Sequence, residues 1–216
     1  MTQNNICHLI FIVLLLIQGD ETYFMGNNSE ILTKEQILIA TEDALRRFGV
    51  AKASVTDVAH ILNVSHGTIY RHFKSKSELL EGVTEKWLDE KIIKPLTDVC
   101  NDTSMEGTKH LQTYIQTLIE LKHHFASEDE EMFKMYAKVT EEAADLIYKH
   151  INHITDQMSE IITRDGIKSE DPSRLAHAIF YATIRFHHPA HAYEWKSPTI
   201  YTEFLDVWAL IEKGLK

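Results

Sequence analysis

The sequence predicts an all-α protein. Long segments repeat apolar residues at helical spacing, and the residues that interrupt helices are scarce, with 4 prolines and 8 glycines among 216 residues. The sequence also indicates where two of the helices begin. Thr33 with Gln36, and Ser54 with Asp57, each have the spacing of a capping box, in which two side chains satisfy the first backbone N–H groups of a helix.

The first expected helix spans residues 33–48. It begins at the Thr33 capping box and ends before Gly49, because glycine suits the position that follows the last turn of a helix. Its buried face is expected to consist of Ile37, Thr41, Ala44, Leu45 and Phe48.

A pair of short helices follows, and it is the most informative part of the chain. Residues 54–73 read SVTDVAHILNVSHGTIYRHF. Asn63-Val64-Ser65 supplies a short turn, and Ile69 and Phe73, four residues apart, give the second helix a buried face. The other face carries side chains that can donate to phosphates or reach base edges: His66, Thr68, Tyr70, Arg71 and His72. The pattern predicts a helix-turn-helix that binds DNA.

Residues 64–76 follow the spacing V-S-x-G-T-x-Y-x-H-F-x-x-K. This spacing resembles the TetR family of bacterial transcriptional repressors, in particular its AcrR-like members. The resemblance is strongest over residues 33–80, and elsewhere only size and helical pattern match. It implies an N-terminal three-helix DNA-binding head, here residues 31–78, and a C-terminal helical body for ligand binding and dimerisation, residues 79–216.

The start of the second short helix is suited to DNA. Gly67 has no side chain, so the helix can approach the DNA backbone closely. Ser65 precedes free N–H groups at a helix N-terminus, which attract phosphate. His66 and Thr68 are the candidates for base readout.

Further contacts are expected on either side of that start. The resemblance implies that Tyr70 and His72 hold phosphates and that Lys76 clamps another. Two alternatives stay open: Tyr70 can be partly a packing residue, and Ser65 can be only an N-cap. The full expected set of DNA contacts is Lys34, Thr56, Ser65, His66, Gly67, Thr68, Tyr70, His72 and Lys76.

Charge is distributed unevenly along the chain. The formal net charge is −10, which by itself argues against a nucleic-acid partner. Residues 33–76, however, contain seven Lys and Arg against four Asp and Glu, a net charge of +3, so the rest carries −13. A mildly basic head on an acidic body is compatible with a protein that touches DNA at one end.

Other function classes are less favoured. Cys7 and Cys100 are far apart, which excludes a disulfide scaffold or zinc-finger spacing and fits a cytoplasmic location. The chain has no nucleophile elbow, phosphate-binding glycine loop or HExxH motif, so we expect a regulator without a cofactor rather than an enzyme. A helical adaptor that has lost DNA binding is an alternative, and the intact motif counts against it.

The N-terminal extension, residues 1–30, is expected to be untranslated or disordered. Leu9 to Ile17 reads LIFIVLLLI, well short of the ~18–20 residues that span a bilayer, so no membrane is expected as a partner. No Lys or Arg precedes Lys34, which disfavours a signal peptide. We favour translation from Met25; the alternative is a hydrophobic tail packed on the protein or on a membrane surface.

Apolar spacing predicts further helices in the body. Pro95 should end or kink the first of them, and residues 101–107 should form a loop. An acidic segment, residues 127–131, should open a middle helix. The other expected helices span about residues 75–93, 108–125, 141–163, 172–187 and 199–214.

The family resemblance implies that the last two of these helices form a four-helix bundle across a two-fold axis. A homodimer would then read a pseudo-palindromic operator. The alternative is that their apolar stripes are only intramolecular core.

A pocket for a small-molecule effector of unknown identity is expected between the helix that begins at residue 75 and those spanning 108–187. Most lining candidates could instead be plain core. Arg185 differs, because a charge in an apolar helix needs a partner, either an anionic effector or an acid such as Glu194. The expected lining is Trp87, Tyr114, Phe125, Phe133, Tyr136, Phe180, Tyr181 and Arg185.

Histidines gather in the segment HHPAH, residues 187–191. His187 and His191 have the i, i+4 spacing of a helical metal pair, but Pro189 lies between them, and no cysteine or carboxylate is close enough in sequence to complete a zinc set. We expect a histidine-lined pocket or interface rather than a metal site. A metal-responsive regulator of the same fold is the alternative.

Overall fold

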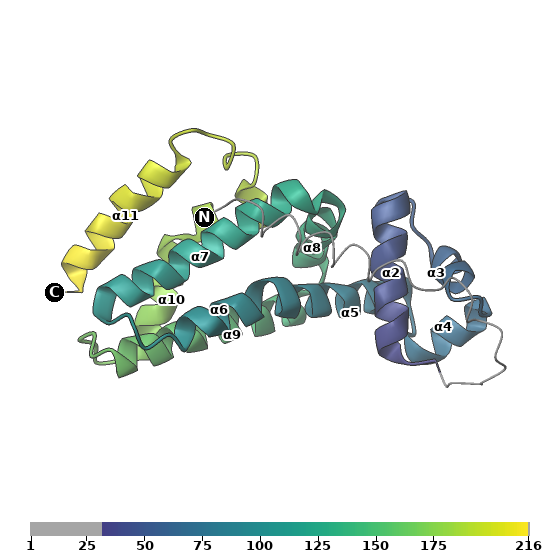
Figure 1. Cartoon of the computed structure of the whole chain (residues 1–216), viewed down its shortest axis with the longest axis horizontal. Helices are drawn as coiled ribbons and strands as arrows, with labels where there is room; N and C mark the ends of the chain where they lie inside the picture. Colours follow the sequence, from purple (N-terminus) through teal and green to yellow (C-terminus); the bar gives the residue numbers. More distant parts are fainter. Residues whose placement is uncertain (1–31, 216) are drawn as a thin grey trace, which may run out of the picture. The chain divides into compact units, whose positions relative to one another are not determined.

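The computed structural model describes residues 32–215. The predictions about Leu9 to Ile17 and a start at Met25 lie outside the described residues. Within residues 32–215 the chain forms helices and no strand, which confirms the all-α prediction (Figure 1). The α-helices are α2 (Lys34–Phe48), α3 (Val55–Ile61), α4 (His66–His72), α5 (Lys76–Leu88), α6 (Lys94–Cys100), α7 (Gly107–Glu128), α8 (Glu130–Glu142), α9 (Ala144–Arg164), α10 (Pro172–Ala182) and α11 (Ile200–Gly214).

Both predicted capping boxes are confirmed. The backbone N–H of Gln36 donates to the Thr33 hydroxyl over 3.2 Å, and the Thr33 N–H donates to the Gln36 side chain over 2.8 Å. Ser54 and Asp57 make the same reciprocal pair at the start of α3. Helices α2 and α3 therefore begin where the sequence predicts, and α2 ends before Gly49 as expected.

Helices α2, α3 and α4 form a small bundle around Ile37, Val58 and Ile69, and α5 packs against α2. The packing of α5 is tight at Gly82. A Cβ atom there would lie 3.2 Å from both the Leu38 and the Phe73 side chains. The head is thereby held closely on the first turns of α5.

Helix α5 continues into the body through a turn wider than an α-helix. The segment η1 (Asp89–Ile93) is π-helical, with the Lys94 N–H bonding to the Asp89 carbonyl, and α6 then runs to Cys100. The sequence predicts that Pro95 ends or kinks this helix, and the regular α-helix is interrupted directly before it, by η1. Pro95 lies in the first turn of α6, where its missing N–H costs least, and the wide turn before it gives room for its ring.

The body is built around α7 and α9. Helix α7 packs on α6, α8 and α9, and α10 lies along α9. Their buried faces form a continuous core that includes Leu111, Leu118, Met158 and Ile161. The acidic segment opens the middle helix as predicted, with Glu130 and Glu131 in the first turn of α8, although α7 continues as far as Glu128.

Two further boundaries differ from the sequence prediction. Helix α10 stops at Ala182, not near residue 187, and the buried Thr183 that follows it bonds through its hydroxyl to the Ile179 and Phe180 carbonyls. Two short 3₁₀ turns follow, η2 (Ile184–Phe186) and η3 (Pro189–His191). Helix α11 begins close to its predicted position and buries Ile200, Phe204 and Trp208.

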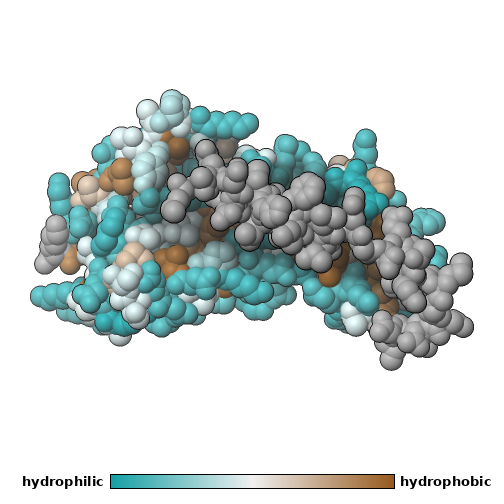
Figure 2. Space-filling view, viewed as in Figure 1, coloured by the Kyte–Doolittle hydropathy of each residue, from teal (hydrophilic) through white to brown (hydrophobic). Residues whose placement is uncertain are grey.

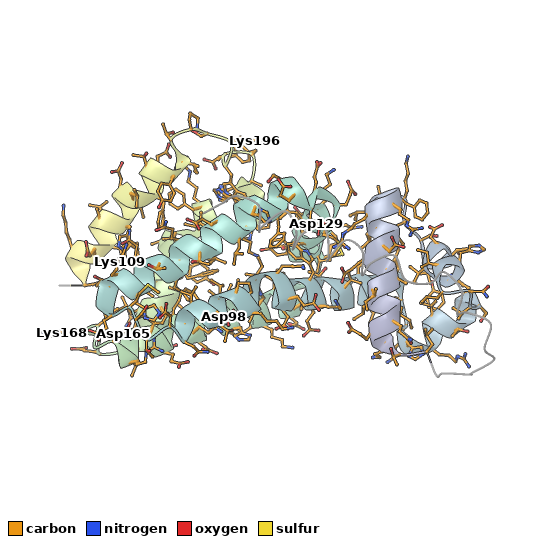
Figure 3. The ribbon with its side chains drawn as sticks, in the orientation of Figure 1. Asp98, Lys109, Asp129, Asp165, Lys168 and Lys196 are labelled. Atoms are coloured by element: carbon orange, nitrogen blue, oxygen red, sulfur yellow. The ribbon has the colours of Figure 1, made fainter. Side chains whose placement is uncertain are left out.

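Two contacts tie α2 and the residues after it to the start of α8. Arg46 pairs with Asp129, and the Val50 N–H donates to a Glu131 carboxylate oxygen over 3.0 Å. Asp129 lies at the end of the body nearest α2, whereas Asp165 lies at the other end (Figure 3). Asp165 is held there by the buried His110 ring, whose other nitrogen faces the Val99 carbonyl.

On the face seen in Figure 2 the described residues are mostly hydrophilic, with hydrophobic patches between them, including some over α11. None of the described helices combines the length and the hydropathy needed to cross a membrane.

Candidate nucleic-acid interface and internal cavity

Helix α4 begins at Ser65, whose extended backbone and hydroxyl cap the first turn. The Ser65 hydroxyl accepts from the Thr68 N–H over 3.2 Å and lies 2.8 Å from the Thr68 hydroxyl. Asn63 makes the preceding turn with a φ of 51°, a left-handed conformation that asparagine tolerates better than most residues. This turn sets α4 against α3, with Ile69 buried between them.

The outer face of α4 presents polar groups to solvent. His66 and Tyr70 are both exposed, and their rings meet edge to face with centroids 4.8 Å apart. Thr68 is partly buried, and Arg71 donates to its hydroxyl over 3.3 Å. These donors lie on one face of one short helix, so they can approach a single groove of DNA together.

Gly67 leaves the first turn of α4 open. Its φ is not in the left-handed region, and a Cβ added there would meet nothing closer than the Ser65 hydroxyl at 3.9 Å. The fold therefore does not require glycine here. The empty space faces outward beside the capped N-terminus, where a DNA phosphate could approach the backbone closely.

Two expected contacts are already engaged within the protein. The Lys76 ammonium donates to the Ala53 carbonyl over 2.6 Å, tying the start of α5 to the segment before α3. The Lys34 ammonium lies 5.3 Å from the centre of the Phe73 ring. Thr56 is exposed in the first turn of α3, and His72 is half-buried at the end of α4.

The body contains a small internal cavity of about 20 Å³, between α7, α8, α9 and the segment after α10. Four of its lining residues are polar and basic: Lys122, His150, His187 and His188. A second hollow of about 130 Å³ lies between α5, η1 and α9 and shares His150 with the cavity. The remaining lining of the cavity is Leu118, Tyr136, Ile147, Ile151, Ile154 and Phe180.

Comparison with known proteins agrees with both parts of this geometry. Residues 37–83 match the family described as bacterial regulatory proteins, tetR family, and residues 107–208 match the tetracyclin repressor-like C-terminal domain. The chain belongs to the TetR family.

Among curated TetR-type regulators, the chain is similar to the HTH-type transcriptional regulator TtgR of Pseudomonas putida. The two are 38% identical over 53 residues, which are 24% of this chain and 25% of TtgR. The chain thus matches about a quarter of the length of this relative.

Solved structures share the fold over most of the chain. A TetR transcriptional regulator from Legionella pneumophila has a TM-score of 0.55 at 23% identity, covering 88% of this chain and all of the other. BioQ, solved with its natural double-stranded DNA operator, has a TM-score of 0.54 at 19% identity, covering 85% of this chain and 98% of BioQ.

In this TetR-family chain, the predicted pocket residues separate into four groups. Tyr136 and Phe180 line the cavity. Trp87, Phe125 and Phe133 form an aromatic cluster beside it, in which the Trp87 ring lies 5.5 Å from Phe125 and 5.9 Å from Tyr136. Tyr114 belongs to the core, where its hydroxyl donates to the Gln157 side chain over 2.8 Å.

Tyr181 and Arg185 lie away from the cavity and from the aromatic cluster beside it. Tyr181 is 52% exposed on the outer face of α10. Because α10 ends at Ala182, Arg185 lies in η2 and points to ion pairs with Glu194, at 2.7 Å, and Glu203. Of the two partners that the sequence suggested for Arg185, the internal acid Glu194 is the one observed.

The histidines of the HHPAH segment also separate. His187 is buried, where its ring faces the Thr183 hydroxyl and the Phe180 carbonyl, and burial lowers its pKa to about 3. His191 instead pairs with Glu194 over 2.8 Å. Among residues 32–215, no three His, Cys, Asp or Glu side chains are grouped as metal ligands would be.

Two histidines of the predicted histidine-lined pocket, His187 and His188, line the cavity, but sequence reasoning missed Lys122 and His150. Lys122 falls at helical spacing after Leu111, Ile115 and Leu118, all buried on α7. A lysine on that stripe is the signal that could have identified it.

Proposed function

We propose that this TetR-family chain is a repressor that binds a pseudo-palindromic DNA operator as a homodimer and releases it when a small-molecule effector occupies the body. One observation carries the proposal: α4 presents its exposed donors beside an open glycine at a capped helix N-terminus. The operator bound to BioQ supports double-stranded DNA as the partner. A cytoplasmic location follows from access to DNA.

The proposed DNA contacts remain the nine predicted residues, now with Arg71 added because it is exposed on the same face of α4. We divide the chain into a head, residues 31–78, and a body, residues 79–216. This boundary falls within α5, which packs on α2 of the head and on α8 of the body. A tilt of α5 could therefore carry a signal from the body to the head.

Dimerisation through α10 and α11 is supported by the apolar side chains that these helices expose. Within the described residues, α11 is held to the body mainly through three buried residues, and the Phe204 ring contacts Phe186 with centroids 5.6 Å apart. Exposed apolar side chains of this kind commonly mark protein interfaces. They are Tyr181 on α10 and Tyr201, Leu205 and Leu210 on α11.

Effector binding is supported by the cavity and the adjoining hollow, which lie against α5 and α8. Both helices also touch α2, so a ligand that moves either of them would change how the head is held. The ligand can shift this equilibrium only by its differential affinity for the two shapes. By linkage, operator DNA must weaken effector binding by the same factor.

A gel-shift assay with the DNA upstream of the chain's own gene tests the proposal, since regulators often lie beside their targets. We expect specific binding that weakens as salt rises, and weaker binding by Tyr70→Ala at every salt concentration, with little change in salt slope because tyrosine carries no charge. Tyr148→Ala, an exposed tyrosine on α9, is the matched control and should leave binding unchanged. Equal binding by wild type and Tyr70→Ala at every salt concentration would show that α4 is not the DNA-binding face.

A further inference from the structure

Lys122 on α7 is a buried cation without a polar partner. Lys122 is only 2% exposed, and its ammonium has no hydrogen-bond acceptor among residues 32–215. The ammonium lies instead 4.0 Å from the centre of the Tyr136 ring. A buried ammonium is costly unless it is paired, so this position calls for an explanation.

The same cavity holds a second unsatisfied group. The Nε2 atom of His150 on α9 is also buried and has no hydrogen-bond partner among the described residues. None of the residues that line the cavity is an Asp or a Glu. The cavity therefore contains two unsatisfied polar groups from two different helices, and no acidic side chain lines it to receive their hydrogen bonds.

Two other cations, Lys86 on α5 and Arg185 after α10, are paired with acids, unlike Lys122. The Lys86 ammonium lies 2.9 Å from Glu90 and 3.3 Å from Glu42. Arg185 likewise has two carboxylates, although it is far more exposed than Lys122. Lys86 and Arg185 therefore have acidic partners, whereas Lys122, which is more deeply buried than either, has none among the described residues.

The adjoining hollow offers space for an apolar group. Its volume is about 130 Å³, compared with about 20 Å³ for the cavity, and His150 lines both. Its apolar lining is Leu88, Ile93 and Leu146, and its charged lining includes Glu85 and Lys149. A molecule with an anionic end and a short apolar body would match the two spaces, with the anionic end in the cavity and the apolar body in the hollow.

We propose that Lys122 and His150 bind the carboxylate of a small organic acid, whose apolar part occupies the hollow beside Leu88, Ile93 and Leu146. The carboxylate would accept hydrogen bonds from the Lys122 ammonium and from an Nε2–H of His150. This inference rests on the proposed effector response and names the chemical class of that effector.

The cavity itself accommodates only a water-sized group, so binding requires side chains to move. Tyr136 packs on the Lys122 ammonium and belongs to α8, whose first residues hold Arg46 and Val50. Drawing Lys122 toward a carboxylate would loosen its contact with Tyr136. The change would thus begin on the helix that contacts the head.

Isothermal titration of the full-length protein, without DNA, tests the site directly. The probes are hexanoate and benzoate, with hexanamide and benzamide as neutral analogues of the same shape. We expect the carboxylates to bind at least about tenfold more tightly than their amides, because only they neutralise Lys122. Equal affinity of acid and amide, or no binding of either acid at millimolar concentration, would overturn the proposal.

Variants give a second, independent measurement. Lys122→Met should abolish carboxylate binding and raise the melting temperature of the free protein, since a buried charge is replaced by an apolar chain of similar length. Lys138→Met on α8 is the matched control, because Lys138 is exposed and at most weakly paired. Carboxylate binding that survives in Lys122→Met would refute the assignment, and the acid–amide comparison in wild type decides the case if that variant does not fold.

Operator release separates this inference from the proposed function. If a carboxylate binds through Lys122 but leaves the operator complex intact, the effector response fails while the site stands. If another compound releases the operator equally from wild type and Lys122→Met, the proposed function stands and the carboxylate site is wrong as the effector site.

Discussion

Arg46 and Asp129, 83 residues apart in sequence, join the head to the body through two hydrogen bonds. The Arg46 Nε and Nη2 atoms donate to the two carboxylate oxygens of Asp129 over 3.1 and 2.9 Å. This two-point geometry fixes direction as well as distance. It holds the C-terminal turn of α2 against the start of α8.

Loosening this pair should affect DNA binding more than folding. Because Arg46 is 42% exposed, Asp129→Asn should reduce the free energy of unfolding by less than about 1 kcal/mol. Operator affinity should fall by up to about fivefold, since the head loses part of its preorganisation. Urea denaturation and gel shifts measure the two effects.

Arg47→Met is the control for that variant. Arg47 pairs with Asp43 inside α2, at 2.7 Å, and contacts no body residue through that pair. If Asp129→Asn and Arg47→Met changed operator affinity equally, the head–body contact would have no special role.

Gly67→Ala should have opposite effects on the stability of the free protein and on its affinity for the operator. The added methyl group has free space, and alanine favours a helix over glycine by up to about 1 kcal/mol, so the free protein should become slightly more stable. Operator affinity should nevertheless fall, because the methyl group lies where the DNA backbone approaches. Thermal unfolding and gel shifts check the two parts, and unchanged operator affinity would argue that this turn does not face DNA.

Lys76→Ala should show two effects, because the Lys76 ammonium bonds to the Ala53 carbonyl. Loss of that bond should lower the stability of the head by about 1 kcal/mol. If Lys76 also reaches a phosphate, the slope of log affinity against log salt should decrease by about one. A stability loss without a change in slope would make Lys76 a structural residue only. His66→Ala should instead alter sequence preference, measured by selection from random DNA.

Leu205→Glu should break the proposed dimer. The side chain is exposed on α11 beside other exposed apolar residues, so the isolated fold should tolerate the charge. Buried across a two-fold interface, the same charge would be repelled by its copy. Sedimentation should show monomers and operator affinity should collapse, whereas Tyr148→Glu on α9 should remain dimeric; a dimeric Leu205→Glu protein would move the interface elsewhere.

Lys122 should make stability depend on pH. Burial lowers the pKa of Lys122 from its ordinary 10.5 to about 7, so between these values the unfolded chain binds more protons than the folded protein. The destabilisation caused by the buried Lys122 charge is therefore fully present below about pH 7 and decreases as the pH rises above that value. Urea denaturation at pH 7, 8 and 9 should show Lys122→Met most stabilising at pH 7 and less so at pH 9.

Comparing the two proteins at each pH removes the contribution of other groups. Burial lowers the pKa of His150 and of His187, so these residues act below pH 6.5, while burial raises the pKa of Tyr136 and of Cys100, which act at high pH. A difference between wild type and Lys122→Met that does not change with pH would mean that Lys122 stays charged in the folded protein.

The head could be predicted from sequence because its signals are local. Each capping box involves residues three apart, and the motif of α4 is contained in residues 64–76. Such patterns do not depend on distant contacts. The helix starts and the polar face of α4 therefore appeared in the structure as expected.

The body was harder to predict because tertiary contacts decide its boundaries. Helix α10 ends at Ala182, although nothing in the local sequence marks that residue as a stop. Pro95 was expected to end or kink a helix, but the sequence does not reveal that a π turn precedes it. Lys122 was overlooked because a single lysine among apolar residues usually reaches solvent, and only the packing of α8 and α9 shows that it does not.

The wide turn at Asp89–Ile93 also sets the angle by which α6 is rotated about the helix axis relative to α5. One added residue turns the following helix by about 100° relative to a regular α-helix. A chimeric sensor that grafts this body onto another regulator's head must keep all five residues of the turn together. A junction made within it, or a one-residue deletion that regularised it, would present the grafted head at a different angle to its DNA while leaving every helix intact.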